Sequence, residues 1–279
     1  MTERPTVFVL GHRGMLGHVV ARHLADLGLN ILTTDERYVG QPRDPLIECV
    51  RKSKAAWVVN AIGRIKHKSS VMEELILTNS LLPLQLSARL HADQRLLHAS
   101  TDCVFDGMVG KYRTEEESTA TDDYGFSKML GECAAKSNRS QVFRVSIIGP
   151  ELGHSHGLLG WFFRQSGDVA GFTNHFWNGI TTLEWAKRAA DLILGRWVPS
   201  APVVQLASLN TLSKYELLCM AAKVWKRHDI EVKAKAVFPS IDRTLVGDFI
   251  CPSLDDQMVE LRQWYNCKFW PVFAEPFDE

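Results

Sequence analysis

The sequence predicts an α/β protein built on a doubly wound parallel sheet, with a smaller α-rich lobe that binds the substrate. Three observations predict this fold. Short apolar runs rich in β-branched residues alternate with longer stretches of helical periodicity. Glycines or small polar residues follow several of these runs directly, as they do at the carboxyl ends of parallel strands. There is no internal repeat and no low-complexity linker, so we expect two lobes packed together with a ligand crevice between them.

The first strand is expected at Thr6–Leu10, a short apolar run typical of a buried parallel strand. The loop Gly11-His12-Arg13-Gly14-Met15-Leu16-Gly17 follows at once, and a helical pattern begins at Val19. This order of strand, glycine loop and helix indicates a dinucleotide site, because a helix N-terminus attracts a pyrophosphate. The cofactor-binding candidates in this loop are Gly11, Arg13, Gly14, Met15, Leu16 and Gly17. The spacing is G-x-x-G-x-x-G rather than G-x-G-x-x-G, and a structural glycine turn remains an alternative.

The second strand is expected at 30–34 and ends at Asp35. An acid at this place usually accepts a hydrogen bond from the ribose 2′-hydroxyl, which favours NADH. Arg13 and Arg37 favour NADPH instead, because either could pair with a 2′-phosphate, although both could also be solvated surface residues. The sequence therefore leaves NADPH and NADH open.

The third strand is expected at 55–60, and Asn60-Ala61-Ile62-Gly63 ends it with small residues that let the backbone approach a cofactor. Arg64, Lys66, His67 and Lys68 form a basic cluster that faces either an anionic substrate or water. A long helix is expected over 73–91, and its Asn79 could hold the backbone of the site through an amide contact. We therefore count Asn60, Ala61, Ile62, Gly63 and Asn79 as cofactor-site candidates.

The fourth strand, expected at 95–99, ends in Ser100-Thr101-Asp102-Cys103. Ligands of open α/β sheets bind outside the carboxyl ends of the strands, where these side chains would lie. The Thr101 hydroxyl could bind a substrate carbonyl, although a turn hydroxyl bonded to its own backbone is the alternative. Ser100 is a cofactor-site candidate, and Thr101, Asp102 and Cys103 are substrate-site candidates.

A helix entered near Asp122 or Asp123 carries Tyr124 and Lys128 at positions i and i+4, which share one helix face. A phenol of pKa near ~10 is a poor acid or base at neutral pH. An ammonium within ~4–6 Å would lower that pKa by roughly 1–3 units. The pair thus predicts proton-transfer chemistry, and two exposed side chains that merely share a face are the alternative.

The second half of the chain indicates architecture more clearly than chemistry. A strand at 141–145 precedes a loop at 151–157, and a further strand at 203–207 returns to the sheet. Helices are expected at 158–165, 183–194 and 212–228. The stretch 172–182 combines aromatic and amide groups, so its Asn174, Trp177 and Asn178 are candidates for a substrate wall. Residues 1–150 are then the nucleotide-binding (Rossmann) domain, and 151–279 form mainly the substrate-binding lobe.

The composition excludes several classes of protein. Lys+Arg and Asp+Glu both number 32, so there is no excess positive charge for nucleic acid or a membrane surface. The six cysteines have no metal-type spacing and suit a reducing compartment. We expect neither a signal peptide nor a membrane-spanning segment. We expect a cytoplasmic protein without a metal, since His154 and His156 lack a third ligand. The oligomeric state is open, with a homodimer as one option.

Several stretches resemble the extended short-chain dehydrogenase/reductase superfamily, in particular the dTDP-4-dehydrorhamnose reductase branch. They are Ser100-Thr101-Asp102-Cys103-Val104-Phe105-Asp106-Gly107, Tyr124-Gly125-Phe126-Ser127-Lys128 and Leu212-Ser213-Lys214-Tyr215-Glu216-Leu217. The resemblance implies a catalytic triad of Thr101, Tyr124 and Lys128, with Tyr124 and Lys128 also touching the nicotinamide cofactor. It further implies reduction of a nucleotide-diphospho-4-keto-6-deoxysugar in polysaccharide biosynthesis.

One departure opens an alternative. Cys103 stands where the rhamnose branch has Tyr, whereas GDP-fucose synthase, whose glycine loop is similar, has a Cys there and uses it in epimerisation. A bifunctional epimerase/reductase is therefore one alternative, with an inert, packed thiol at Cys103 as the competing interpretation. A non-catalytic regulatory subunit is another, because a reductase-like partner of methionine adenosyltransferase has this fold.

Overall fold

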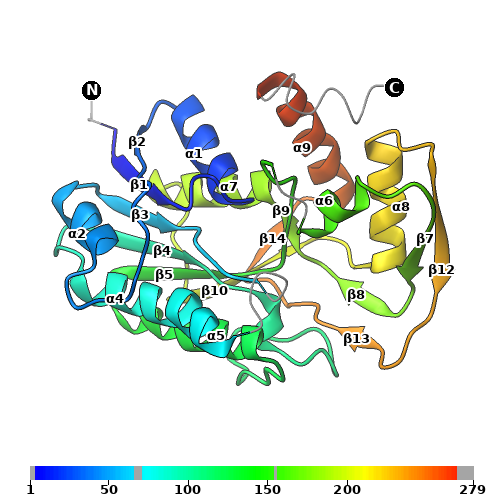
Figure 1. Cartoon of the computed structure of the whole chain (residues 1–279), viewed down its shortest axis with the longest axis horizontal. Coiled ribbons are helices and arrows are strands. Elements are labelled where there is room, and N and C mark those ends of the chain that lie inside the picture. The colour runs from blue at the N-terminus through cyan, green and yellow to red at the C-terminus, as the bar shows by residue number, and fades with distance from the viewer. Residues whose placement is uncertain (1–3, 66–70, 154–155, 269–279) are drawn as a thin grey trace.

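The computed structural model describes residues 4–65, 71–153 and 156–268. Its core is a seven-stranded parallel sheet in the order β14-β10-β5-β4-β3-β1-β2 (Figure 1). The strands are β1 (Thr6–Leu10), β2 (Asn30–Leu32), β3 (Trp57–Asn60), β4 (Arg95–Ala99), β5 (Ser140–Arg144), β10 (Val203–Ser208) and β14 (Phe249–Cys251). The predicted doubly wound α/β fold is confirmed.

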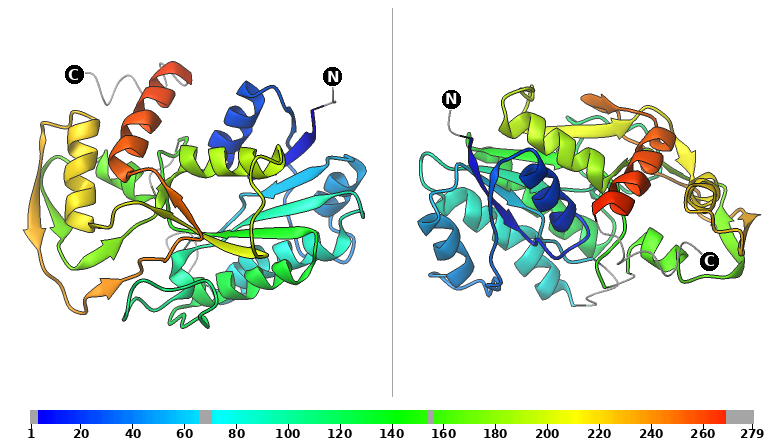
Figure 2. Two further views of the ribbon diagram at one scale, coloured as in Figure 1. Left: turned by 180° about the vertical axis from the view of Figure 1, so that it is seen from behind. Right: turned by 90° about the horizontal axis from the view of Figure 1, so that it is seen from above.

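Helices cover both faces of the sheet. One face carries α1 (Gly17–Asp26) and α7 (Thr182–Ile193), and the other carries α2 (Pro45–Lys52), α4 (Leu82–Arg89) and α5 (Asp123–Glu132) (Figures 1 and 2). Strand β1 has apolar side chains on both faces of the sheet, and they alternate between two apolar clusters. Val7 and Val9 pack in the cluster under α1 and α7, whereas Phe8 and Leu10 pack in the cluster under α2 and α4. A strand buried on both faces has to be continuously apolar, as this one is.

The sheet unit takes in segments beyond residue 150. Strands β10 and β14 extend it on one edge, and α7 packs against α1. Strand β10 was expected from the sequence, whereas β14 was not. The boundary at residue 150 thus stays a prediction, because the two units interleave along the chain.

The lobe contains helices and three small sheets. Strands β7 (Gly167–Phe172) and β12 (Ile230–Lys235) pair in parallel, and α8 (Lys214–Val224) packs against both. The other small sheets are β11-β8-β13 and β6-β9, built from β6 (Ile147–Ile148), β8 (His175–Trp177), β9 (Ile180–Thr181), β11 (Leu212–Ser213) and β13 (Ile241–Asp242). Helices α6 (Leu158–Phe162) and α9 (Leu254–Lys268) complete the lobe. The sequence predicted α6 and α8 but neither α9 nor these strand pairs.

The helix expected over 73–91 has an irregular centre. It is observed as α3 (Met72–Leu75), a π-helical segment η2 (Ile76–Leu81) and α4. Short 3₁₀ turns occur at η3 (Asp102–Val104), which follows β4 after two residues, and at η4 (Cys133–Lys136), directly after α5. None of the helices in the described ranges has the length and apolar character needed to cross a membrane. The six cysteines all fall within those ranges and are free thiols.

Candidate active site

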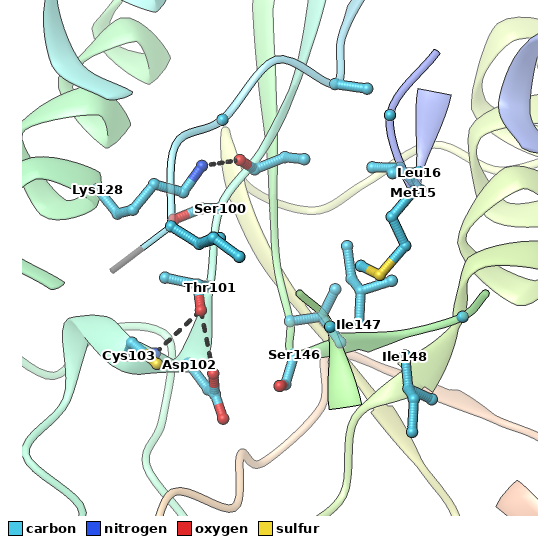
Figure 3. A pocket seen from close by; sticks show the side chains of 18 of the residues that line it. Met15, Leu16, Ser100, Thr101, Asp102, Cys103, Lys128, Ser146, Ile147 and Ile148 are labelled. Carbon is cyan, nitrogen blue, oxygen red and sulfur yellow. Dashed lines mark hydrogen bonds between the residues drawn. The ribbon is translucent and has the colours of Figure 1, made fainter. Parts of the chain in front are cut away.

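A cavity of about 420 Å³ lies at the carboxyl ends of β1, β3, β4 and β5, between the sheet and the lobe (Figure 3). It brings together twelve residues that the sequence marked as candidates: Gly14, Met15, Leu16, Ala61, Ile62, Gly63, Ser100, Thr101, Asp102, Cys103, Tyr124 and Lys128. Ser146 and Glu151 also line it and were missed. Ser146 follows the strand near 141–145, so the strand-end rule that selected Ser100 could have found it.

The glycine loop leaves the N-terminus of α1 open. Gly11 has φ +76°, and a Cβ on Gly17 would lie 2.1 Å from the carbonyl oxygen of Gly11, so only glycine lets the helix start this close to the loop. Side chains of Asp44, Asp122, Thr181 and Ser213 cap α2, α5, α7 and α8, whereas no side chain in the described chain caps α1. Uncapped N–H groups at a helix N-terminus fit a phosphate.

Arg13 and Asp35 lie together at the edge of this loop. The Arg13 guanidinium Nη2 is 2.9 Å from Asp35 Oδ1, and both side chains are largely exposed. His12 Nε2 is 3.7 Å from the same carboxylate oxygen. The two residues that gave opposite indications about the cofactor are therefore paired with each other, while Arg37 is exposed.

Asn60 and Asn79 act on the walls of the cavity through the backbone. The Asn60 Oδ1 atom accepts a hydrogen bond of 3.1 Å from the N–H of Ile62. The Asn79 amide clamps Arg64, accepting from its N–H at 2.8 Å and donating to its carbonyl at 2.9 Å. Asn79 also donates to Ser127 Oγ at 3.0 Å, which ties η2 to α5. A π-helical turn often marks a functional site, and this one places Asn79 between Arg64 and α5.

Thr101, Asp102 and Cys103 form the turn that leaves β4. The Thr101 hydroxyl donates to Asp102 Oδ1 at 3.1 Å and accepts from the N–H of Cys103 at 3.2 Å (Figure 3). Thr101 and Asp102 are both buried. The alternative reading of Thr101 as a turn hydroxyl therefore describes part of its bonding, and the same hydroxyl also lines the cavity.

Tyr124 and Lys128 both line the cavity from α5, which begins after the Asp122 cap. The Lys128 ammonium donates to the carbonyl of Ala99 at 2.6 Å (Figure 3). Burial lowers the pKa of Lys128 to about 8, while the charges of Glu132 and Cys103 act to raise it.

The expected effect of Lys128 on Tyr124 is not found. Burial raises the pKa of Tyr124. The charges of Cys103 and Asp102 raise this pKa further, whereas a hydrogen bond with Thr101 acts to lower it. The ammonium is directed to Ala99 instead. Tyr124 is consequently a protonated phenol at neutral pH, which can donate but not accept a proton.

The substrate wall expected at 172–182 is not brought to the cavity. Asn174 bonds both backbone groups of Val237, and Asn178 bonds both backbone groups of Leu245. Trp177 is buried under the Lys214 ammonium, which lies 5.2 Å from its ring centroid. In the structure these amide and indole groups tie loops to the core, and their assignment to a substrate wall stays a prediction.

The basic cluster is only partly described. Arg64 forms an ion pair with Glu74. Lys66, His67 and Lys68, as well as His154, lie outside the described residues.

This fold, with a glycine loop and a Thr–Tyr–Lys set around one cavity, defines a protein of the extended short-chain dehydrogenase/reductase class. The model of the RmlD substrate binding domain matches residues 5–161, more than half of the 279 residues. The chain belongs to this family, which confirms the resemblance to dTDP-4-dehydrorhamnose reductases that the motifs indicated.

Solved structures with the same fold have low sequence identity to the chain. A dTDP-4-dehydrorhamnose reductase from Bacillus anthracis in complex with NADP has a TM-score of 0.80 at 13% identity, covering 94% of this chain and 99% of that one. The GDP-mannoheptose C4 reductase from Campylobacter jejuni with NADP bound has a TM-score of 0.73 at 11% identity, covering 95% and 99%. The Bordetella bronchiseptica enzyme WbmG in complex with NAD and UDP has a TM-score of 0.72 at 16% identity, covering 95% and 96%. A search of curated protein sequences found no match.

Proposed function

We propose that the protein is an NAD(P)H-dependent oxidoreductase that reduces the keto group of a nucleotide-diphospho-4-keto-6-deoxysugar. One observation carries the proposal: Thr101, Tyr124 and Lys128 line the same cavity as the glycine loop at the uncapped start of α1. A binding-only protein has no need of a phenol, a hydroxyl and an ammonium gathered beside a dinucleotide loop.

Met15 and Leu16 would hold the cofactor pyrophosphate through backbone N–H groups, while Gly63, Ser100 and Lys128 would hold the nicotinamide end. Gly14 would shape the loop, because its own N–H donates to the Gly11 carbonyl. The residues fit this group, because a Cβ at Gly17 would collide with the loop and Gly63 leaves room beside Lys128. When bound, the reduced nicotinamide supplies a hydride to the carbonyl carbon.

The substrate oxygen is the site where the chain's own residues act. On substrate binding the Thr101 hydroxyl would turn its hydrogen from Asp102 to the carbonyl oxygen. Tyr124 would bond the same oxygen and transfer its proton to it as negative charge develops there. Burial keeps Tyr124 protonated beforehand, so the acid is available at neutral pH. Lys128, whose ammonium is directed to the Ala99 carbonyl, would serve the cofactor rather than the phenol.

Family membership supports a nucleotide-sugar substrate, and the relatives' bound NADP, NAD and UDP are consistent with it. Reduction at C4 is named for the Campylobacter relative. On this basis we propose a role in sugar-nucleotide and polysaccharide biosynthesis, in the cytoplasm, with a homodimer as the assembly to test first.

A bifunctional epimerase/reductase is the second candidate, because Cys103 lines the same cavity two residues from Thr101. Solvent deuterium entering the carbons beside the ketone, and loss of that exchange in Cys103→Ser, would favour it. Reduction without exchange would favour the simple reductase.

The test of the proposal is NADPH and NADH oxidation, followed at 340 nm, across a panel of nucleotide-4-keto-6-deoxysugars. We expect at least one of these keto sugars to be reduced. Nucleotide sugars that lack the keto group should give no cofactor oxidation. A cofactor that binds but is never oxidised by any keto sugar would favour the regulatory-subunit alternative.

A further inference from the structure

Glu132 is a buried carboxylate that the proposed reaction does not use. It is the last residue of α5, one helical turn after Lys128, and its side chain is 10% exposed. The carboxylate points inward to the junction of β4 and β5. There its Oε1 atom accepts a hydrogen bond of 2.6 Å from the Ser100 hydroxyl.

Arg144, from β5, fixes the orientation of this carboxylate. Its Nε and Nη2 atoms donate to Glu132 Oε1 and Oε2 at 2.9 Å and 2.6 Å, which is a bidentate pair. The guanidinium also lies 5.2 Å from the Phe105 ring centroid and donates to the carbonyl of Thr114 at 3.3 Å. These contacts fix the Arg144 guanidinium, and the bidentate pair in turn fixes the orientation of the Glu132 carboxylate.

The bond to Glu132 determines what Ser100 can offer a ligand. A serine hydroxyl has one hydrogen, and here that hydrogen is donated to the carboxylate. Ser100 lines the cavity next to Lys128 (Figure 3), so the remaining lone pairs of its oxygen are available there. Ser100 is therefore set up as an acceptor for a ligand hydroxyl or amide.

Glu132 and Lys128 are four positions apart on α5 and bond the adjacent residues Ser100 and Ala99, so the carboxylate lies close enough to act on the ammonium. The titratable groups that interact with this ammonium are Glu132 on its own helix, Cys103 on the neighbouring turn and His98 on β4, while the protonated Tyr124 lines the same cavity. Burial holds the pKa of His98 well below its ordinary value, so it adds no charge. Of the groups that raise the pKa of Lys128, Glu132 has the largest effect.

We propose that Glu132 is a positioning residue that acts through Ser100 and Lys128, orienting the hydroxyl of one and keeping the other an ammonium. The inference rests on the proposed function, because it assigns Ser100 and Lys128 to the cofactor side of the cavity. It goes beyond a structural ion pair, since a purely structural Glu132 would leave the protonation of Lys128 unchanged.

The test compares Glu132→Gln, which removes the charge, with Glu132→Asp, which keeps it. The pH above which kcat/KM for reduction falls should move down by about 1 pH unit or more in Glu132→Gln, the size of shift that a neighbouring charge causes. Glu132→Asp should keep the wild-type profile. Glu48→Gln, which breaks a half-exposed ion pair with Arg51 on α2, is the control and should leave the profile unchanged.

If Glu132→Gln does not fold with Arg144 unpaired, Glu132→Gln/Arg144→Met removes both charges, a replacement that folded cores often tolerate. A downward shift is again expected, smaller than in Glu132→Gln because the positive charge of Arg144 is removed as well. An unchanged pH profile in a folded variant without the Glu132 charge would overturn the inference.

A second readout needs no activity. The free energy of unfolding is measured by urea unfolding between pH 6 and 11 for the wild type and for Glu132→Gln. Each is compared with the same protein carrying Lys128→Met in addition. The stability relative to the Lys128→Met protein starts to rise with pH at the folded-state pKa of Lys128. This rise should therefore begin at a lower pH in Glu132→Gln than in the wild type. Identical curves would overturn the inference even if no keto sugar is turned over, whereas shifted curves without turnover would refute only the proposed function.

Discussion

The Arg13 guanidinium and the Asp35 carboxylate form an ion pair of 2.9 Å between the glycine loop and the segment after β2. Each of these side chains alone would select a different cofactor, the carboxylate by accepting from a ribose 2′-hydroxyl and the guanidinium by pairing with a 2′-phosphate. Their contact means that removing Asp35 releases Arg13 from this ion pair, and that removing Arg13 leaves Asp35 with the more distant His12.

We therefore expect opposite effects from Asp35→Ala and Arg13→Ala. Asp35→Ala should raise the ratio of kcat/KM with NADPH to that with NADH by about 10-fold or more, and Arg13→Ala should lower it similarly, the range for a charge-assisted hydrogen bond. Both side chains are exposed, so the assay needs low ionic strength. Equal ratios in the two variants would show that the cofactor adenosine binds elsewhere.

Lys128 should make the folded protein less stable at neutral pH. Burial lowers its pKa to about 8, so the unfolded chain binds more protons than the folded one between pH 8 and the ordinary lysine pKa. Stability relative to Lys128→Met should thus be lowest below pH 8 and rise towards pH 10.4, by about 3 kcal/mol in total. Urea unfolding across this pH range measures it. A wild-type protein that is more stable than Lys128→Met at pH 7, with no dependence on pH, would contradict the assignment.

Asn178 should matter for stability rather than for substrate affinity. Its amide bonds the N–H and carbonyl of Leu245 at 2.9 Å and 2.8 Å, and Asn178→Ala leaves both backbone groups buried without that partner. We expect a loss of about 2–4 kcal/mol in the free energy of unfolding with an unchanged KM for the sugar nucleotide. A raised KM for the sugar nucleotide at unchanged stability would instead support Asn178 as a substrate-binding residue.

The sheet and most of the cavity could be predicted because they follow from local pattern. Apolar runs such as Thr6–Leu10 mark buried strands, and the polar residues that follow them meet at one edge of the sheet. This reasoning placed Thr101 and the glycine loop in the same cavity although 90 positions separate Gly11 from Thr101 in sequence. The cap at Asp122 and the i, i+4 spacing did the same for Tyr124 and Lys128.

What could not be predicted depends on contacts between distant segments. The pairing of β7 with β12 joins residues more than sixty positions apart, and neither strand carries a signal for its partner. The π-helical turn around Asn79 adds residues to a turn without breaking the apolar pattern. The direction of the Lys128 ammonium depends on where the Ala99 carbonyl lies, and the raised pKa of Tyr124 depends on how deeply the folded chain buries the phenol.

The central claim is that Tyr124 donates a proton to a substrate oxygen, and Tyr124→Phe tests it most directly. Tyr38→Phe, which removes a buried hydroxyl outside the cavity, is the matched control. The measurement is kcat for NAD(P)H oxidation by a keto-sugar nucleotide that the wild type reduces, with cofactor binding checked in each variant. We expect Tyr124→Phe to bind the cofactor and lose roughly 10²–10⁴-fold in turnover while Tyr38→Phe keeps it. Turnover by Tyr124→Phe at the wild-type rate would contradict the account.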